Sequence, residues 1–223
     1  DLRSPIGSIK MVLNMLMLNL SEEQIGKEMY EMLNMANQTT EEAFSLLDNL
    51  LKWTKSQIGK LNVVYQQFDL AETTQGLTEI FAIAARLKNI SFELKGLDHA
   101  SVFADIDMTK TVERNLLSNA IKFSPEGSAV TVSIEEDTEN AIVHITDRGC
   151  GMSPEDQQKL FRLDTHFSTF GTNNEEGSGL GLLLCQDFVQ RNGGRLWFES
   201  EKGKGSTFSF SLPKRKREDN VSI

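Results

Sequence analysis

Three short clusters of residues in this chain have types and spacings that suit a phosphorylated ligand. In the first, Asn115 and Asn119 are four residues apart, Lys122 is three residues further on, and Phe123 comes next. Residues at this spacing share one face of a helix. An amide oxygen can coordinate a hard cation such as Mg²⁺, and a lysine ammonium can meet phosphate charge. The cluster therefore suits a metal-bound phosphate, although an ordinary polar helix surface would carry the same residue types.

The second cluster is Asp147, Gly149 and Gly151, directly after an alternating, strand-like segment. A carboxylate at a strand end can accept a hydrogen bond from an exocyclic amine. Glycines beside it let the backbone approach a flat base closely. By itself this cluster is weak evidence, because an Asp followed by glycines is most often a simple turn.

The third cluster opens an expected helix with alternating glycines: Gly177, Ser178, Gly179, Leu180 and Gly181. The free N–H groups of a helix start can bind phosphate. The cluster lacks the preceding strand of a dinucleotide-binding fingerprint, and no Gly-Lys-Ser/Thr follows as in a Walker A loop. It is therefore a candidate anion site of another kind.

Residues 1–60 are expected to form an antiparallel helical hairpin. Mostly apolar residues recur at spacings of three and four, the pattern of helices packed as coiled coils: Leu2, Ile6, Ile9, Leu13, Leu16, Leu20, then Ile25, Met29, Met32, Ala36, Thr39, Ala43, Leu46, Leu50 and Trp53. Ser21 and Gln24 form a capping box at the turn between the helices. Two such seams cannot both be buried by one hairpin, so we predict a homodimer with a four-helix bundle.

Residues 61–213 mix strands and helices without regular repeats, which favours an α/β sandwich with a mixed sheet and helices on one face. The expected helices cover 69–88, 107–123 (capped by Asp107) and 180–192; the expected strands cover 62–68, 90–94, 102–106, 130–135, 141–146, 195–200 and 207–212. Residues 214–223 are expected to be a solvated, flexible basic and polar tail. The fold class is therefore α+β.

Composition excludes several classes of protein. The net charge is −9, from 32 acidic and 23 basic residues, which argues against nucleic-acid binding. No apolar run reaches the ~20 residues that cross a bilayer, so we expect no membrane contact and a cytoplasmic location for this piece. Cys150 and Cys185 are not a Cys-x-x-Cys pair and are expected to be reduced thiols.

The order of the three clusters is more specific than any one of them. It resembles the N, G1 and G2 boxes of the ATPase superfamily that contains histidine kinases, gyrase, heat-shock chaperones and mismatch-repair proteins. Leu160 and Phe161, with Phe167, resemble the F box of the ATP lid, here 152–176, at a different spacing. Residues 1–5, Asp-Leu-Arg-Ser-Pro, resemble the segment after the phosphoacceptor histidine of sensor histidine kinases.

This resemblance implies that the chain binds ATP with Mg²⁺. Asn119 would coordinate the metal, and Asn115 and Lys122 would contact metal or phosphates. Asp147 would recognise the adenine amino group, and Phe123 would pack near the base. Close backbone approach would fall to Gly149, Gly151, Gly177, Gly179 and Gly181, and Phe161 would belong to the lid.

The resemblance also implies phosphotransfer to a histidine just before Asp1, a position that the sequence does not include. Asp1 would accept a proton from that imidazole. Ser4 would stand where relatives carry Thr or Asn, which leaves phosphatase activity open. The next acceptor would be a response-regulator receiver domain. None of His99, His144 and His166 lies in a matching context, so this polypeptide should bind ATP without phosphorylating its own bundle.

Two other functions compete with this interpretation. A hydrolysing ATPase of the same superfamily would commonly carry a glutamate where this chain has Asn115, and an amide cannot act as a general base. A dimerisation module that only senses nucleotide would not need the complete set of Asn119, Lys122 and Asp147.

Overall fold

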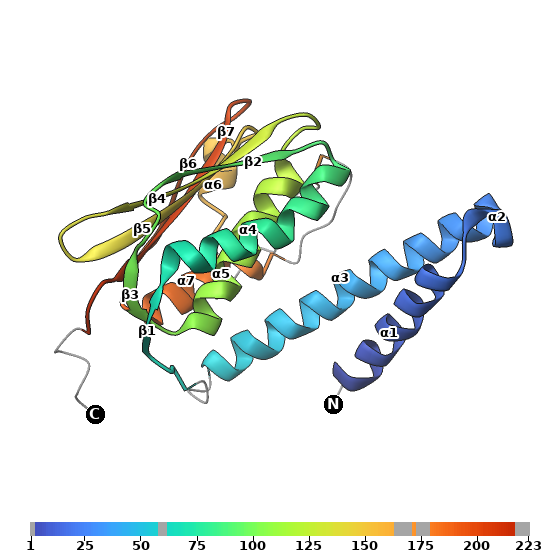
Figure 1. Cartoon of the computed structure of the whole chain (residues 1–223), viewed down its shortest axis with the longest axis horizontal. Coiled ribbons are helices and arrows are strands. Elements are labelled where there is room, and N and C mark those ends of the chain that lie inside the picture. The colour runs from blue at the N-terminus through green and yellow to red at the C-terminus, as the bar shows by residue number, and fades with distance from the viewer. Residues whose placement is uncertain (1–2, 58–61, 163–170, 173–178, 217–223) are drawn as a thin grey trace. The chain divides into compact units, whose positions relative to one another are not determined.

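The computed structural model describes residues 3–57, 62–162, 171–172 and 179–216. The chain forms two compact units, Asp1–Leu61 and Asn62–Ile223. In Figure 1 the first unit is helical and the second combines helices with strands.

The first unit is the expected helical hairpin. Helix α1 spans Arg3–Asn19, a short α2 spans Glu22–Ile25, and α3 spans Lys27–Gln57. The side chain of Gln24 accepts the backbone N–H of Ser21 at 2.9 Å, which is one half of the predicted capping box. Gly26, with φ at +79°, provides the turn into α3. Many large apolar side chains of this unit stay exposed: Ile9, Met11, Val12, Met15, Leu16, Leu18, Met29, Met32, Met35, Leu46, Leu50 and Leu51.

The second unit is built on a five-stranded mixed sheet with the order β2-β4-β5-β7-β6. The strands are β2 (Ser91–Gly96), β4 (Ala129–Glu136), β5 (Asn140–Asp147), β6 (Leu196–Glu201) and β7 (Gly205–Pro213). Only the β2–β4 pair is parallel. Every second residue of β5 is buried, as in a strand with one face on the core.

Three helices cover one face of this sheet: α4 (Leu70–Leu87), α5 (Ile106–Phe123) and α7 (Gly181–Arg191). A small antiparallel pair, β1 (Gln66–Asp69) and β3 (Ser101–Ala104), precedes α4 and α5. A short helix, α6 (Pro154–Gln157), follows β5 and was not expected. The α+β class, with helices on one face of a mixed sheet, is confirmed.

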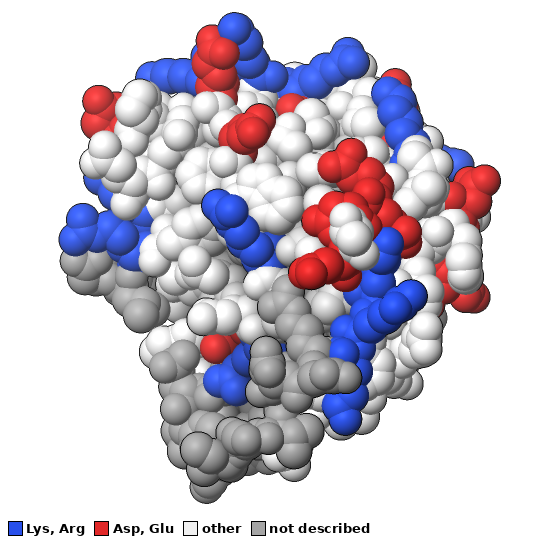
Figure 2. All heavy atoms as spheres, turned by 90° about the vertical axis from the view of Figure 1, so that its left-hand side faces the viewer, with Lys and Arg blue, Asp and Glu red and all other residues white. Residues whose placement is uncertain are grey.

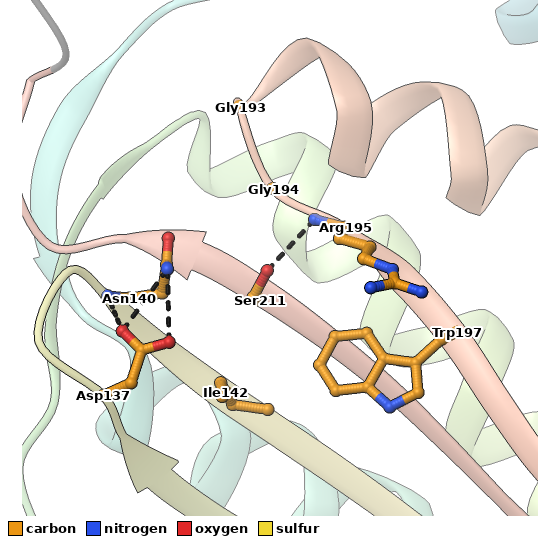
Figure 3. A pocket seen from close by; sticks show the side chains of 8 residues that line it. All are labelled: Asp137, Asn140, Ile142, Gly193, Gly194, Arg195, Trp197 and Ser211. Carbon is orange, nitrogen blue, oxygen red and sulfur yellow. Dashed lines mark hydrogen bonds between the residues drawn. The ribbon is translucent and has the colours of Figure 1, made fainter.

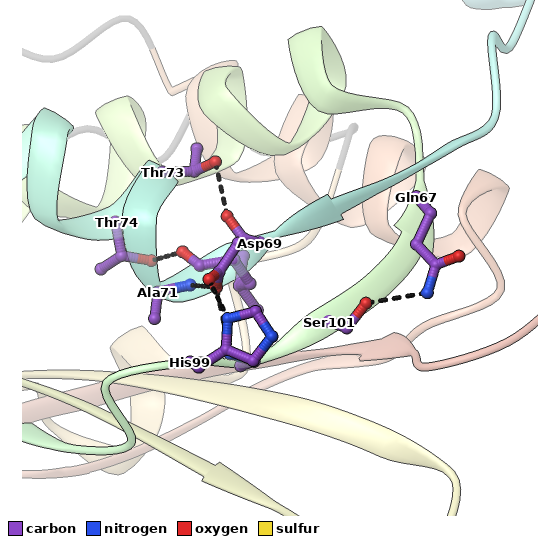
Figure 4. Close-up of polar contacts among 9 residues, drawn as sticks. Gln67, Asp69, Ala71, Thr73, Thr74, His99 and Ser101 are labelled. Atoms are coloured by element: carbon purple, nitrogen blue, oxygen red, sulfur yellow. Dashed lines mark hydrogen bonds and ion pairs between the residues drawn. The ribbon is translucent and has the colours of Figure 1, made fainter.

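Asp69 begins α4 as predicted, with more partners than the sequence suggested. Its carboxylate accepts the N–H of Ala71 at 2.9 Å and that of Ala100 at 3.0 Å, and it pairs with the ring of His99 (Figure 4). Burial acts to raise the pKa of Asp69, but the bonds from Ala100, His99 and Ala71 hold it below its usual value. The carboxylate therefore fixes both the start of α4 and the loop between β2 and β3.

Two expected boundaries are wrong. The N-cap of α5 is Asp105 and not Asp107, because the Asp105 carboxylate accepts the N–H groups of Asp107 and Met108, both at 3.0 Å. The first strand begins at Gln66 and not at residue 62. Side chains hold the preceding segment instead: the Tyr65 hydroxyl donates to the carbonyl of Arg191 at 2.7 Å.

Lys214, the first residue of the expected solvated tail, is bonded to the rest of the second unit. The backbone N–H of Lys214 donates to the carbonyl of Glu139 at 2.8 Å, and its ammonium lies 3.2 Å from the carboxylate of Glu136. Lys214 therefore holds the end of β7 against the turn between β4 and β5. Residues 58–61, two parts of the expected lid (163–170 and 173–176) and residues 217–223 lie outside the described residues.

Candidate functional site

Helix α5 carries the first cluster, with the amides of Asn115 and Asn119 and the ammonium of Lys122. Its inner side is buried through Val112, Leu116, Leu117 and Ala120, while Asn115, Asn119 and Lys122 remain partly exposed. The Asn115 amide N–H donates to the carbonyl of Thr111 at 2.9 Å. That bond orients the side chain and leaves its oxygen available as an acceptor.

Helix α7 meets α5 at Gly181. A Cβ atom added to Gly181 would lie 2.7 Å from the Asn115 oxygen, so any side chain there would strike the amide. Gly179 has φ at +67°, a conformation that favours glycine. The last part of the third cluster therefore lies against the first, and Leu180 between these glycines is partly exposed.

Asp147 ends β5 and is 5 % exposed. One carboxylate oxygen, Oδ1, accepts the N–H of Gly149 at 2.8 Å and that of Ser206 at 3.2 Å. Burial raises the pKa of Asp147 even though both bonds act to lower it. The structure gives the other oxygen, Oδ2, no hydrogen bond with the residues it describes, so that oxygen can accept from a ligand.

The glycines after Asp147 are required by close backbone approach. A Cβ on Gly149 would lie 2.3 Å from the carbonyl oxygen of Phe123, the last residue of α5. Gly151 has φ at +58°, and a Cβ there would lie 1.9 Å from the carbonyl oxygen of Glu201. The second cluster is thus pressed against the end of α5, as the third is pressed against its middle.

Two predicted aromatic residues occupy different environments. Phe123 lies beside the cluster, with the Lys122 ammonium 5.0 Å from its ring centre. Phe161 packs its ring on Phe198, with centres 5.8 Å apart, and Phe198 packs on Phe208 at 5.7 Å. Phe161 therefore anchors the start of the expected lid on β6 and β7.

Some predicted site residues cannot be compared with the rest. Asp1, Gly177, Ser178 and Phe167 lie outside the described residues, as does His166. Ser4 is exposed in the first turn of α1, where its carbonyl accepts the Ser8 hydroxyl at 3.1 Å. It belongs to the other compact unit.

The two described histidines each bond to nearby side chains of the second unit. His99 pairs with the capping carboxylate of Asp69. His144 contacts the Ser209 hydroxyl at 2.7 Å and the Glu135 carboxylate at 3.1 Å on the open face of the sheet.

Sequence reasoning missed two residues that touch the site. The Lys88 ammonium donates to the carbonyls of Ile121 at 3.0 Å and Lys122 at 2.9 Å. The backbone N–H of Thr172 also donates to the Lys122 carbonyl, at 3.1 Å. Pro125 could have indicated this from the sequence. It has no backbone N–H, so the last carbonyls of the preceding helix need donors from elsewhere.

The donor set fits Mg²⁺ held jointly with phosphates. Among the residues that the structure describes, no group of three His, Cys, Asp or Glu side chains could hold a metal by itself. Mg²⁺ commonly takes one or two protein oxygens and completes its octahedron with substrate phosphates and water. The partly exposed amides of Asn115 and Asn119 can supply such oxygens.

A separate hollow lies on the open face of the sheet. It has a volume of about 450 Å³ and is lined by Asp137, Asn140, Ile142, Gly193, Gly194, Arg195, Trp197 and Ser211 (Figure 3). No residue of the three clusters lines this hollow. It is therefore not the candidate nucleotide site, despite its volume. The face in Figure 2 carries acidic and basic side chains side by side, without one continuous basic surface.

The fold and the order of the three clusters agree with one protein family. The family model "Histidine kinase-, DNA gyrase B-, and HSP90-like ATPase" matches residues 104–216, about half of the chain. The match begins at the end of β3 and includes all three clusters. The chain belongs to this family.

Curated relatives narrow the class to sensor histidine kinases. The chain is 31 % identical over 222 residues to the adaptive-response sensory kinase SasA of Rippkaea orientalis, covering 96 % of this chain and 55 % of that protein. It is 33 % identical over 220 residues to the sensor protein EvgS of Escherichia coli O157:H7, covering 96 % of this chain and 18 % of that one. The chain thus spans about half or less of these relatives, and within that span it is similar to the catalytic cores of sensor histidine kinases.

Solved structures share the fold. Full-length ShkA, solved in complex with AMPPNP, superposes with a TM-score of 0.72 at 20 % identity, over 95 % of this chain and 43 % of that one. The catalytic domain of the histidine kinase ThkA gives a TM-score of 0.59 at 27 % identity, over 68 % of this chain and 96 % of that one. None of the helices in residues 3–57, 62–162 or 179–216 is long and apolar enough to cross a bilayer.

Proposed function

We propose that this chain binds Mg-ATP and transfers the γ-phosphoryl group to a histidine placed directly before Asp1, and from there to an aspartate of a response-regulator receiver domain. The observation that carries the proposal is the approach of both glycine segments to α5. Gly149 lies against the carbonyl of Phe123, and Gly181 lies against the amide of Asn115. As a result, the carboxylate of Asp147, the amide oxygens of Asn115 and Asn119 and the ammonium of Lys122 all lie on or next to α5.

Each residue has a distinct task in this proposal. Asp147 accepts the adenine amino group through Oδ2, because Oδ1 is already engaged by Gly149 and Ser206. Asn119 and Asn115 hold the metal-bound phosphates, and Lys122 offsets their charge. When bound, Mg²⁺ neutralises charge on the transferred group.

In the transfer, the bond between the γ-phosphorus and its bridging oxygen breaks, and ADP leaves with the electron pair. An imidazole nitrogen forms the new bond to phosphorus. Asp1 holds the other ring nitrogen and accepts its proton, the general-base part of the step. Because the acceptor precedes Asp1, we propose that the chain as given binds nucleotide without phosphorylating itself.

The proposal includes a homodimer through the hairpin unit. The exposed apolar residues of α1 and α3, such as Ile9, Leu16, Met32 and Leu50, need a partner surface. A second hairpin would bury them as a four-helix bundle.

The experiment compares this chain with a version that carries a histidine added before Asp1. With γ-labelled ATP and Mg²⁺, we expect label in the extended chain only, and none after Asn119→Ala in that chain. Calorimetry should show Mg-ATP binding by both parent chains. Labelling of the unextended chain would contradict the proposed acceptor. Rapid ATP hydrolysis without labelling of either chain would favour a hydrolysing ATPase.

A further inference from the structure

Helix α5 ends in a way that leaves backbone acceptors without helical donors. The Ser124 N–H donates to the carbonyl of Ala120 at 3.1 Å, and this is the last helical bond. The carbonyl of Ile121 would next accept from residue 125, but residue 125 is proline and has no N–H. The last turn of the helix that carries Lys122 therefore needs donors from elsewhere.

Lys88 supplies them from the end of α4. Its ammonium donates to the carbonyls of Ile121 at 3.0 Å and Lys122 at 2.9 Å, and the residue is only 7 % exposed. A buried ammonium is costly unless it is hydrogen-bonded. A cation at a helix C-terminus also interacts favourably with the helix dipole. The geometry thus explains both why Lys88 is buried and why α5 can end at this position.

Thr172 holds the same turn from another side. Its backbone N–H donates to the Lys122 carbonyl at 3.1 Å, and its hydroxyl donates to the Ser124 carbonyl at 2.9 Å. Lys88 precedes α5 in the chain, whereas Thr172 lies between α6 and α7. The turn that carries Lys122 is therefore fixed by two segments that are far apart in the sequence.

We propose that Lys88, assisted by Thr172, is a positioning residue that fixes the last turn of α5 so that the Lys122 ammonium meets the terminal phosphates of ATP. This inference rests on the proposed function. Lys88 acts through the backbone of Lys122 and does not touch the nucleotide itself. A residue that only capped the helix would affect the fold as a whole, so the two roles differ in what they do to phosphate recognition.

The first test measures phosphate and base recognition separately. Lys88→Met keeps the length of the side chain and removes its charge and donors. We expect Mg-ATP to bind roughly tenfold more weakly, the scale of one charge-assisted hydrogen bond. Adenosine, which reaches only the Asp147 end of the site, should bind as it does to the parent chain. Lys88→Arg should restore much of the Mg-ATP affinity.

The second test is a double-mutant cycle with Lys122. If Lys88 acts through Lys122, Lys88→Met should cost nothing further in a Lys122→Met chain. Lys95→Met is the matched control, because Lys95 is an exposed lysine that pairs with Glu93 on β2. It should leave both affinities unchanged. Should Lys88→Met fail to fold, Thr172→Val, which removes one donor from the same turn, should show a smaller loss for Mg-ATP alone.

The outcomes separate this inference from the proposed function. If the parent chain does not bind Mg-ATP, the proposed function fails. If the parent binds but Lys88→Met and Thr172→Val bind equally well, only the positioning role fails. Equal losses for Mg-ATP and adenosine, or the same loss with and without Lys122, would reduce Lys88 to a structural cap.

Discussion

The two carboxylate oxygens of Asp147 have different roles: one bonds to the protein and the other is available to the expected ligand. Oδ1 holds the turn by accepting from Gly149 and Ser206, which leaves Oδ2 for an amine. An asparagine at this position would place its own oxygen on those two N–H groups. Its NH₂ group would then face the adenine amino group, donor against donor, whereas the 6-oxo group of a hypoxanthine base could accept from it.

Asp147→Asn should therefore reduce the preference for ATP over ITP. A site built to hydrogen-bond one group discriminates strongly against an analogue that lacks it. We expect the ratio of the two affinities to fall by at least about tenfold, the scale of one hydrogen bond to a charged group. Calorimetric titration of both nucleotides with Mg²⁺ measures this ratio.

Asp137→Asn is the matched control. Asp137 also accepts two backbone N–H groups, from Glu139 at 2.8 Å and Asn140 at 2.6 Å, but it lies at the turn between β4 and β5. It should leave the ratio unchanged. An unchanged ratio in Asp147→Asn as well would remove Asp147 from base recognition.

At the scale of elements, the contact between α4 and α5 contains a buried acid. Glu113 on α5 is 0 % exposed and bonds the Thr74 hydroxyl on α4. The same hydroxyl lies 2.8 Å from the Leu70 carbonyl. Burial raises the pKa of Glu113 from 4.5 to about 8, although the hydrogen bond from Thr74 acts to lower it. The folded chain therefore keeps this carboxyl group protonated to a higher pH than an exposed one.

The pH dependence of stability follows from that protonation. The folded chain keeps the proton that the unfolded chain releases above pH 4.5, so the stabilising contribution is complete below pH 4.5. It is lost as the pH rises towards about 8, and each pH unit in this window removes about 1.4 kcal/mol from the free energy of unfolding. Glu113→Gln should remove this dependence and unfold at higher urea concentration than the parent at pH 9. Glu126→Gln, at an exposed position, is the control. Parallel urea midpoints for Glu113→Gln and parent from pH 5 to 9 would contradict the prediction.

Local patterns predicted most elements because burial follows chain periodicity. β5 and α5 each bury one face against the core, which gives β5 its alternating pattern and α5 its apolar face. Their positions could therefore be predicted from the sequence. The strand expected at 62–68 was too long because Tyr65 is held by Arg191, a contact between distant parts of the chain. Lys88, Thr172 and the partner of Glu113 were missed for the same reason. The second and third clusters were found because glycines and a strand-terminal carboxylate form short local motifs, and the first because its amides and lysine recur at helical spacing.

At the scale of the whole molecule, the two units differ in how far each buries its own apolar surface. The second unit closes a core around residues such as Leu116, Ile145 and Phe210. The hairpin exposes apolar residues along both long helices, and Met32 is 59 % exposed. Two helices cannot bury two seams, so the hairpin is the part of the chain that requires a partner.

Sedimentation equilibrium of the parent chain should accordingly show a dimer at micromolar concentration. Met32→Glu would place an unpaired charge in each half of the four-helix bundle, and burying such a charge costs several kcal/mol. We expect it to raise the dissociation constant by at least about a hundredfold, a shift of about 3 kcal/mol, while Mg-ATP affinity stays unchanged. Ile83→Glu is the matched control, because Ile83 is a similarly exposed apolar residue, at 71 %, on α4 of the other unit. If Ile83→Glu dissociates the chain as Met32→Glu does, or if the parent is already monomeric, the hairpin does not form the dimer.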